Sequence, residues 1–270
     1  MHLPEEVINV KDGDVVAVDL ETYDPKLKTH GSGSISGSGF VCGIAIAYRD
    51  EKYYFPIKHK GPKLGASQVW KVLNRRILQN EKIDKVFHNA IYDVCWIRAA
   101  TGLMPKGNLY DTMIAASVID ENRKSYSLDA LSSEYLQDKK YKYDLAERSQ
   151  DEHGISDPMS NMDKLPYDLV KDYAEQDVSL TLRLWNKFKK IIDTPIPVKG
   201  PPSNPVKYKT LKNIFDLETR LFPCLVEMRF KGVRVDENKS KALGDKLKRK
   251  QDIIVQGIKR RTGIDIQIWA

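Results

Sequence analysis

The stretch Val15-Val-Ala-Val-Asp-Leu-Glu-Thr22 decides the fold class of this chain. Its apolar residues ahead of Asp19 predict a buried strand over residues 15–20. On a strand, residues two apart point to the same face, so Asp19 and Glu21 can share a cation. Burying two carboxylates on one face of an apolar strand is costly without a cation or a basic partner. The stretch therefore predicts a central strand that carries metal ligands.

Further strands and helices follow from the apolar pattern of the next residues. Apolar segments predict strands over 40–48, 52–57, 85–88 and 108–111, and the turns between the first three strands favour an antiparallel meander. Helical periodicity or end signals predict helices over 67–79, from a cap at Asn89 to Gly102, up to about 119, from a cap at Ser127 to about 137, and from Pro166 to about 192. Residues 138–165 are polar and are predicted to be irregular.

Two later segments carry the remaining candidate ligands. Asn89 and Asp93 lie in His-Asn-Ala-Ile-Tyr-Asp, and Tyr173 and Asp177 lie one helical turn apart in Tyr-Ala-Glu-Gln-Asp. Taken singly, Asp93 is also explained as a first-turn helix charge, Asp177 as a solvated charge and Tyr173 as a core aromatic. Taken together with the strand, four carboxylates on three elements can converge on two hard divalent ions. Such a pair cleaves phosphodiester bonds.

A second Asp-x-Glu pair tests this interpretation. Asp216 and Glu218 repeat the spacing of the strand pair but fall in a predicted helix over residues 208–231. Residues two apart on a helix diverge by about 200°, so these two carboxylates cannot share an ion. We interpret them as surface charges.

Composition limits the protein class. The chain is 41% hydrophobic and 30% charged, which is ordinary for a soluble protein with a core. No apolar run approaches the roughly 20 residues of a membrane span, and the N-terminus lacks the features of a secretory signal. We therefore expect no membrane partner. The three cysteines, Cys42, Cys95 and Cys224, are far apart and are expected to be reduced, buried thiols.

Charge and proline usage divide the chain. Five of its 13 prolines fall between Asp193 and Lys207, and the net charge of +7 is concentrated in the residues that follow position 180. We predict a catalytic domain over residues 1–193, a stiff linker over 194–207 and a basic helical segment over 208–270. Within the basic segment, Asp236 is predicted to cap a helix that reaches Thr262-Gly263. A basic segment of this kind favours contact with nucleic acid, although a solvated lysine-rich helix face explains it equally well.

The three acidic segments resemble the tyrosine subclass of the DEDD superfamily of 3′–5′ exonucleases. Asp19 with Glu21, Asp93, and Tyr173 with Asp177 match its three motifs, and Asp172 stands where the histidine subclass has histidine. Within the superfamily the chain is most similar to the proofreading domain of family A DNA polymerases, including bacteriophage versions. The similarity extends through Tyr110-Asp-Thr-Met113 and Tyr126-Ser-Leu-Asp-Ala-Leu131, and residues 217–236 resemble the start of a polymerase domain.

This resemblance implies a fold, a reaction and partners. The fold is a ribonuclease H-like mixed five-stranded sheet flanked by helices, followed by a short helical C-terminal segment. Two Mg²⁺ or Mn²⁺ ions are implied, held by Asp19, Glu21, Asp93 and Asp177, with Tyr173 orienting the attacking water. The substrate is a single-stranded DNA 3′ end, which releases nucleoside 5′-monophosphates.

The remaining expectations concern contacts and rival functions. Thr22 and Asn89 are candidates to contact the substrate, with helix capping as the competing role of Asn89. A polymerase domain, in the same parent chain or a separate subunit, is the expected partner, in the cytoplasm of a bacterial or phage-infected host cell. The alternatives are a ribonuclease D-like RNA exonuclease and a non-catalytic DNA-binding editing domain. The intact acidic set disfavours the non-catalytic reading.

Overall fold

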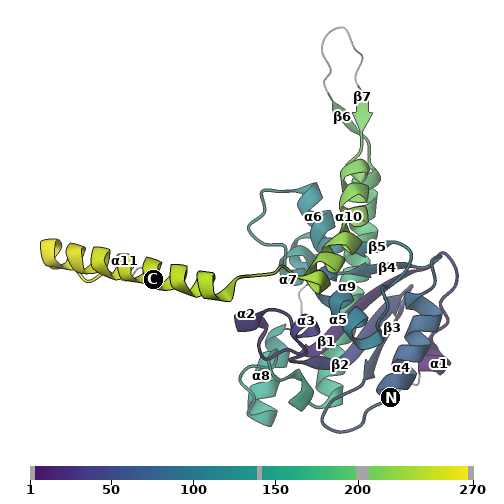
Figure 1. Cartoon of the computed structure of the whole chain (residues 1–270). Coiled ribbons are helices and arrows are strands. Elements are labelled where there is room, and N and C mark those ends of the chain that lie inside the picture. Colours follow the sequence, from purple (N-terminus) through teal and green to yellow (C-terminus); the bar gives the residue numbers. More distant parts are fainter. Residues whose placement is uncertain (1–3, 139–141, 199–206, 267–270) are drawn as a thin grey trace. The chain divides into compact units, whose positions relative to one another are not determined.

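A mixed sheet forms the centre of the molecule's first compact unit. The structure, a computed structural model, describes residues 4–138, 142–198 and 207–266. The main sheet has the strand order β3-β2-β1-β4-β5, with β1, β2 and β3 antiparallel and β4 and β5 parallel to β1 (Figure 1). The strand with Asp19 is central, and the meander and the five-stranded sheet are confirmed. The strands are β1 (Val15–Tyr23), β2 (Phe40–Tyr48), β3 (Glu51–Pro56), β4 (Asp84–Phe87) and β5 (Leu109–Asp111).

The helices lie before, between and after these strands. Before the last strand of the sheet come α1 (Pro4–Val7), α2 (Leu27–His30), α3 (Gly33–Ser36), α4 (Ala66–Leu73) with a π-helical turn η1 (Asn74–Leu78), and α5 (Ala90–Thr101). After it come α6 (Thr112–Ile119), α7 (Leu128–Leu131) with a π-helical turn η2 (Ser132–Leu136), α8 (Lys142–His153), a 3-10 turn η3 (Met162–Lys164), α9 (Tyr167–Asp193), α10 (Lys212–Lys231) and α11 (Glu237–Thr262).

Helices cover both faces of the sheet. Val16, Val18 and Leu20 of β1 belong to a core cluster that includes residues of α4 and α5. Ala17, on the opposite face, belongs to a second cluster built with α6, α7 and α9. Because strand residues alternate between faces, Asp19 has the orientation of Ala17. The carboxylates of β1 therefore face the layer that contains α9.

An irregularity in the β1–β2 pairing lies beside these carboxylates. Glu21 is opposite Gly43, whereas Thr22 is opposite Val41, so Cys42 is an extra residue on β2. Such a bulge bends the strand that carries it and changes the direction of nearby side chains. Accordingly Val41 packs in the α5 cluster and Cys42 in the α9 cluster. The bulge thus reshapes the sheet at the level of the candidate metal ligands.

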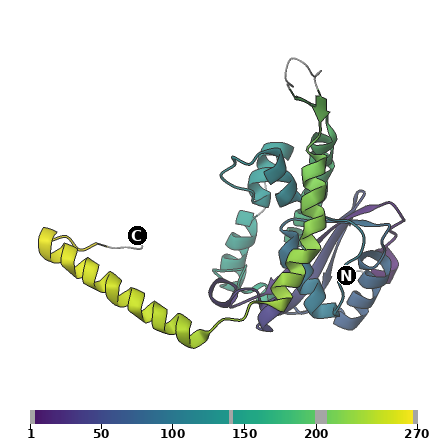
Figure 2. The ribbon, with the colours of Figure 1, turned by 45° about the horizontal axis from the view of Figure 1, so that its top comes forward.

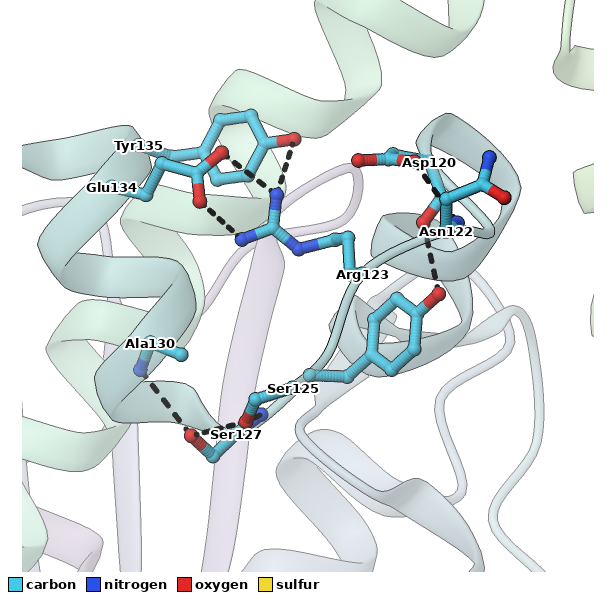
Figure 3. A network of polar contacts seen from close by, with 9 residues as sticks. Asp120, Asn122, Arg123, Ser125, Ser127, Ala130, Glu134 and Tyr135 are labelled. Atoms are coloured by element: carbon cyan, nitrogen blue, oxygen red, sulfur yellow. Dashed lines mark hydrogen bonds and ion pairs between the residues drawn. The ribbon is translucent and has the colours of Figure 1, made fainter.

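Several predicted helix ends are confirmed. Ser127 Oγ accepts the Ala130 N–H at 3.3 Å at the start of α7 (Figure 3). In the same view, Arg123 of the preceding loop pairs with Glu134 of η2. Gly102 ends α5 with φ at 72°. In α11, Asp236 Oδ1 accepts the Lys239 N–H at 3.0 Å.

Two sequence predictions are corrected here. Residues 138–165 were predicted to be irregular, but α8 and η3 occupy part of this stretch. Burial is sparse along α8, where Leu145 and Ser149 are the buried positions among those whose side chains the structure describes. Because most of its residues are charged or polar, the apolar pattern of the sequence does not predict this helix. The cysteine prediction holds for Cys42 and Cys95 only, because Cys224 is exposed.

The division of the chain differs from the predicted boundary. The first compact unit runs to Phe230 and the second begins at Lys231. The cause is α10, in which Phe215 joins the α9 core cluster while Phe222 and Val226 join the α5 cluster.

In the predicted linker, β6 (Ile196–Val198) and β7 (Lys207–Lys209) pair as an antiparallel hairpin, and residues 199–206 lie outside the described part (Figure 1).

The second unit consists chiefly of α11, the long yellow helix in Figure 2. This helix is continuous from Glu237 to Thr262, and none of its residues is buried. Across the residues that the structure describes, no helix combines the length and the apolar character needed to cross a bilayer.

Candidate active site

The strand β1 brings the first two candidate ligands to the α9 side of the sheet. Asp19 is opposite Ala45 and Glu21 is opposite Gly43 on β2. Glu21 is 6% exposed, so its carboxylate is almost entirely removed from water. The residues across from the acids are small, and the space beside Gly43 is filled by the Tyr54 hydroxyl. Local sequence thus places two carboxylates on one face of the sheet.

Asp93 reaches the same strand from α5. The Leu20 N–H, between the two acids, donates to Asp93 Oδ1 at 3.1 Å. Asp93 is 3% exposed. This contact fixes its carboxylate against the backbone of β1, so the second acidic segment meets the first.

The start of α5 is held by Asp111 rather than by the side chain of Asn89. Asn89 occupies the N-cap position as predicted, but its side chain makes no capping hydrogen bond, and its φ is 68°. The Asp111 carboxylate accepts the N–H groups of Asn89 (3.1 Å), Ala90 (2.8 Å) and Met113 (2.8 Å). The competing capping role of Asn89 is therefore wrong, because a residue 22 positions away performs it.

The helix α9 supplies the third acidic segment. Tyr173 and Asp177 are 7% and 6% exposed and lie one turn apart on its sheet-facing side. The Tyr173 hydroxyl also lies 3.7 Å from Met159 Sδ, in the loop before η3. The core-aromatic reading of Tyr173 is partly met, since its ring belongs to the α9 cluster. Its hydroxyl nevertheless faces acids.

Both α5 and α9 pack against β1, and the ionisable groups of the three segments affect one another. Burial, followed by the charges of Asp177, Glu21 and Asp19, raises the pKa of Tyr173 well above its usual value. Burial, followed by the charge of Asp19, raises the pKa of Asp93. Residues from β1, α5 and α9 therefore share one field of negative charge. Such crowding is stable only if a cation or protons offset it.

The donor set is consistent with a hard divalent cation. All four acids offer oxygen ligands, as Mg²⁺ and Mn²⁺ prefer, and three of them are buried. Within the described ranges, however, no three His, Cys, Asp or Glu side chains stand close enough to form a ready-made cage. The residues fit the chemistry of the ion, although the described side chains do not form a ready-made cage for it.

The substrate candidate Thr22 is held by a chain of hydrogen bonds. Thr22 Oγ1 lies 2.7 Å from the hydroxyl of Tyr92, which also donates to Asp24 Oδ2 at 3.4 Å. Asp24 in turn accepts the Gly33 N–H at 3.0 Å, which fastens α3 to the end of β1. Sequence reasoning missed Tyr92 and Asp24. Their positions one residue before Asp93 and two after Thr22 are the signal that could have identified them.

A buried pair beside Glu21 was also missed. The Tyr54 hydroxyl hydrogen-bonds with Nε2 of His59, and these residues are 2% and 5% exposed. A Cβ on Gly43 would lie 2.0 Å from that hydroxyl, so glycine is required opposite Glu21. Burial, then Glu21, raises the pKa of Tyr54. Nothing in the sequence alone distinguishes this pair from ordinary core residues.

Comparison with known proteins gives the family. A family model described as 3′–5′ exonuclease matches residues 2–193. A DNA-directed DNA polymerase of Pseudomonas phage M6 is 30% identical over 228 residues, covering 82% of this chain and 31% of that protein. DNA polymerase I of Borreliella burgdorferi is 26% identical over 270 residues, covering 99% of this chain and 26% of that protein. The chain thus spans less than a third of the length of either relative.

Solved structures show the same fold. Trypanosoma brucei RNase D in complex with GMP is similar with a TM-score of 0.58 at 19% identity, covering 86% of this chain and 63% of that chain. The antiparallel meander β3-β2-β1, the parallel strands β4 and β5 on the other side of β1, and the helices on both faces form a ribonuclease H-like fold. The chain belongs to the 3′–5′ exonuclease family, in the form found in DNA polymerases.

Proposed function

We propose that this chain removes nucleotides from the 3′ end of single-stranded DNA and acts as the proofreading part of a DNA polymerase. The observation that carries the proposal is the meeting of four carboxylates and one tyrosine from β1, α5 and α9. Polymerase relatives of phages and bacteria favour DNA over RNA as the substrate. The polymerase domain is supplied by the same parent chain or by a separate subunit, in the cytoplasm of a bacterial or phage-infected host cell.

In this proposal Asp19, Glu21, Asp93 and Asp177 hold two Mg²⁺ or Mn²⁺ ions. The bound ions supply a nucleophile from water at neutral pH and offset charge on the leaving oxygen. Asp93 is positioned for its share by the Leu20 N–H, which keeps its carboxylate against β1. The buried setting strengthens each electrostatic contact within the site.

Tyr173 has a positioning role in the same reaction. The ordinary pKa of a tyrosine is near 10, so a hydroxyl of this kind stays protonated at neutral pH. A protonated hydroxyl can donate a hydrogen bond or hold a water molecule, but it cannot accept a proton as a base. We therefore assign it the orientation of the attacking water.

Thr22 and Asn89 are proposed to contact the substrate. The Thr22 hydroxyl is fixed by Tyr92 at 2.7 Å, next to the acids of β1. The Asn89 amide is released from helix capping, because Asp111 performs that role. A non-glycine residue with positive φ is uncommon, and such backbone conformations cluster at functional sites.

The basic segment after residue 208 is proposed to add weak, sequence-independent DNA affinity. Within it, α11 carries nine Lys/Arg and three Asp/Glu residues, and none of its residues is buried. Lysine and arginine spread along a helix suit phosphate contact rather than base reading.

One digestion experiment tests the proposal. Labelled single-stranded DNA and RNA of matched sequence are incubated with Mg²⁺ and the parent chain, Asp19→Ala or Asp216→Ala. We expect mononucleotide release from DNA by the parent, none by Asp19→Ala, and the parent rate for Asp216→Ala, whose carboxylate pairs with the exposed Lys212 one turn earlier on α10. A chelator should also stop the parent.

Each alternative predicts a different result. Faster digestion of RNA than of DNA would support a ribonuclease D-like enzyme. DNA binding without release by the parent would support a non-catalytic editing domain. Equal activity of Asp19→Ala and the parent would end the proposed mechanism.

A further inference from the structure

Two half-buried aromatic rings follow the acids of β1 on the same side of the sheet. Tyr23 is two residues after Glu21, and Phe40 is its partner on β2. Their ring centroids are 5.1 Å apart with an interplanar angle of 30°. Both rings pack against the core cluster that contains Tyr173. The pair therefore continues the acidic face of the strand with an aromatic surface.

Backbone packing fixes this pair in place. A Cβ on Gly39 would lie 2.2 Å from the carbonyl oxygen of Tyr23, so only glycine lets β2 begin this close to β1. Cross-strand partners on one face of a sheet stand in direct contact. The rings are thus held in a fixed arrangement before any ligand arrives.

An exposed lysine completes the surface. Lys58 Nζ lies 3.5 Å from the centroid of the Phe40 ring. Its backbone is fastened to the bulge, because the N–H groups of Ile57 and Lys58 both donate to the carbonyl oxygen of Cys42, at 2.8 and 2.7 Å. The backbone of the lysine is thus fixed, whereas its long side chain lets the ammonium move.

This surface lies beside the acids. The bulge residue Cys42 directly precedes Gly43, the partner of Glu21 on β2. The carbonyl oxygen of the same Cys42 accepts the Lys58 N–H at 2.7 Å. Positive charge and aromatic rings border the negative charge of the candidate metal site.

We propose that Tyr23, Phe40 and Lys58 form a nucleotide subsite next to the acids, where a base stacks on the rings and a phosphate meets the lysine. Aromatic platforms combined with cations bind single-stranded nucleic acid without sequence preference. A cation over an aromatic ring is held weakly at an exposed site. An incoming base can therefore displace the Lys58 ammonium from Phe40, and the ammonium then turns to the phosphate of the same strand.

The inference rests on the proposed nuclease function and adds a residue set that the acids do not require. Along a single strand of nucleic acid, each base lies next to a phosphate. The aromatic rings and the lysine lie next to each other in the same manner, so the rings can meet a base while the lysine meets a phosphate. The subsite would hold the substrate strand while its end lies at the acids. Its loss should weaken substrate affinity and leave the chemical step largely unchanged.

The lysine is tested by Lys58→Met, with Lys71→Met as a control of equal charge change at an exposed position on α4. KM and kcat for oligothymidylate digestion are measured over a series of salt concentrations. For Lys58→Met we expect a several-fold rise in KM, kcat within about twofold, and a salt slope shallower by about 0.7, the value for one lost phosphate contact on a single strand. Lys71→Met should match the parent.

The rings are tested from both sides of the contact. Phe40→Leu keeps an apolar side chain and should raise KM by about tenfold, the scale of one stacked base. Substrates are prepared with one abasic site at each of the last three positions of the oligonucleotide in turn. At one of these positions the abasic site should raise the KM of the parent, and at that position it should leave the KM of Phe40→Leu unchanged. Circular dichroism checks the fold of this variant, and Lys58→Met decides the matter if Phe40→Leu is unfolded.

The outcomes separate the two proposals. A parent that releases no nucleotide overturns the proposed function. An active parent whose KM and salt slope are unchanged by Lys58→Met, or whose sensitivity to abasic sites survives in folded Phe40→Leu, overturns the subsite while leaving the nuclease function in place.

Discussion

Two helices of nearly equal length behave in opposite ways in this chain. α9 has 27 residues, of which fourteen are buried, and it carries Tyr173 and Asp177 to the sheet. α11 has 26 residues, none of them buried, and Leu243, Leu247 and Ile254 are more than half exposed. Both were predicted as helices from local signals. Local signals therefore establish that a helix forms, whereas its burial depends on the partner that the rest of the chain supplies.

The difference also separates two ways of contributing to function. Buried α9 holds groups in fixed positions, so it suits chemistry that depends on geometry. Exposed, basic α11 carries its charge on the surface, so it suits electrostatic attraction. Substitutions should therefore affect folding and catalysis in α9, and should have small effects on stability in α11.

The largest effect is expected from where the chain is cut. Ending it after Asp193 removes Phe215, Phe222 and Val226 from the cores, and fully buried side chains of this size contribute about 1.5–3 kcal/mol each. We expect the free energy of unfolding to fall by about 4–9 kcal/mol. Ending it after Phe230 removes only the second unit and should leave stability almost unchanged. Urea unfolding followed by circular dichroism measures both, and equal stability of the two truncated chains would place α10 outside the folded unit.

A single substitution in α9 should have the next largest effect. Trp185 is 3% exposed, and its ring stacks on Tyr110 with centroids 4.2 Å apart. Trp185→Ala should lower the free energy of unfolding by about 3–5 kcal/mol, because the removed ring leaves a cavity. Leu247→Ala on α11 should change it by less than about 0.5 kcal/mol. Denaturant titration compares the two variants, and a similar loss in both would show that α11 is packed in solution.

A buried lysine and an exposed lysine should differ in how they change the pH dependence of the free energy of unfolding. Lys85 is fully buried, its ammonium donates to the carbonyl oxygens of Asn80 (2.6 Å) and Lys106 (2.5 Å), and burial lowers its pKa to about 8. Between that value and the ordinary one near 10.4, the unfolded chain binds the extra proton, so stability rises with pH. The gain is about 2.5 kcal/mol when pH rises from 8 to 10.5.

The control for Lys85 is an exposed lysine of α11. Unfolding free energies are measured from pH 7 to 10.5 for the parent, Lys85→Met and Lys246→Met. The rise should be absent in Lys85→Met and present in Lys246→Met. A difference between the parent and Lys85→Met that does not vary with pH would show that the ammonium is not desolvated.

The smallest predicted effect concerns catalysis by α9. Tyr173→Phe removes one hydroxyl and should raise the activation free energy by about 1–3 kcal/mol, the scale of one hydrogen bond. The Mg²⁺ concentration for half-maximal activity should stay unchanged. Tyr126→Phe, which loses a hydrogen bond from its hydroxyl to the Asp120 carbonyl, is the matched control. Complete loss of activity in Tyr173→Phe would mean that the tyrosine does more than orient water.

The sheet could be predicted from the sequence because its signals are local. β1 and β2 are apolar runs bounded by turns, and the structure places β2 over the predicted residues. The spacing of Asp19 and Glu21 also identified their common face. Tyr173 and Asp177 could be paired because residues one helical turn apart share a face, whereas Asp93 was named from its acidic segment and the family resemblance.

The features that were missed depend on distant residues. The φ of Asn89 is 68° and its helix is capped by Asp111, neither of which a local pattern reveals. α10 carries Phe215, Phe222 and Val226 at helical spacing, but the prolines before it favoured a boundary, and only tertiary contacts place these side chains in two cores. The stretch of α8 has too few apolar residues to show a period.

Asp111 makes the beginnings of α5 and α6 a single kinetic unit. Its carboxylate accepts the N–H groups of Asn89 and Ala90 on one side and Met113 on the other. Exchange of any of these amides with deuterated solvent requires the same carboxylate to leave. Their protection factors should therefore rise and fall together with temperature, although they are separated in the chain. The rate at which the strand-facing end of α5 opens is thus set by a residue that does not belong to it.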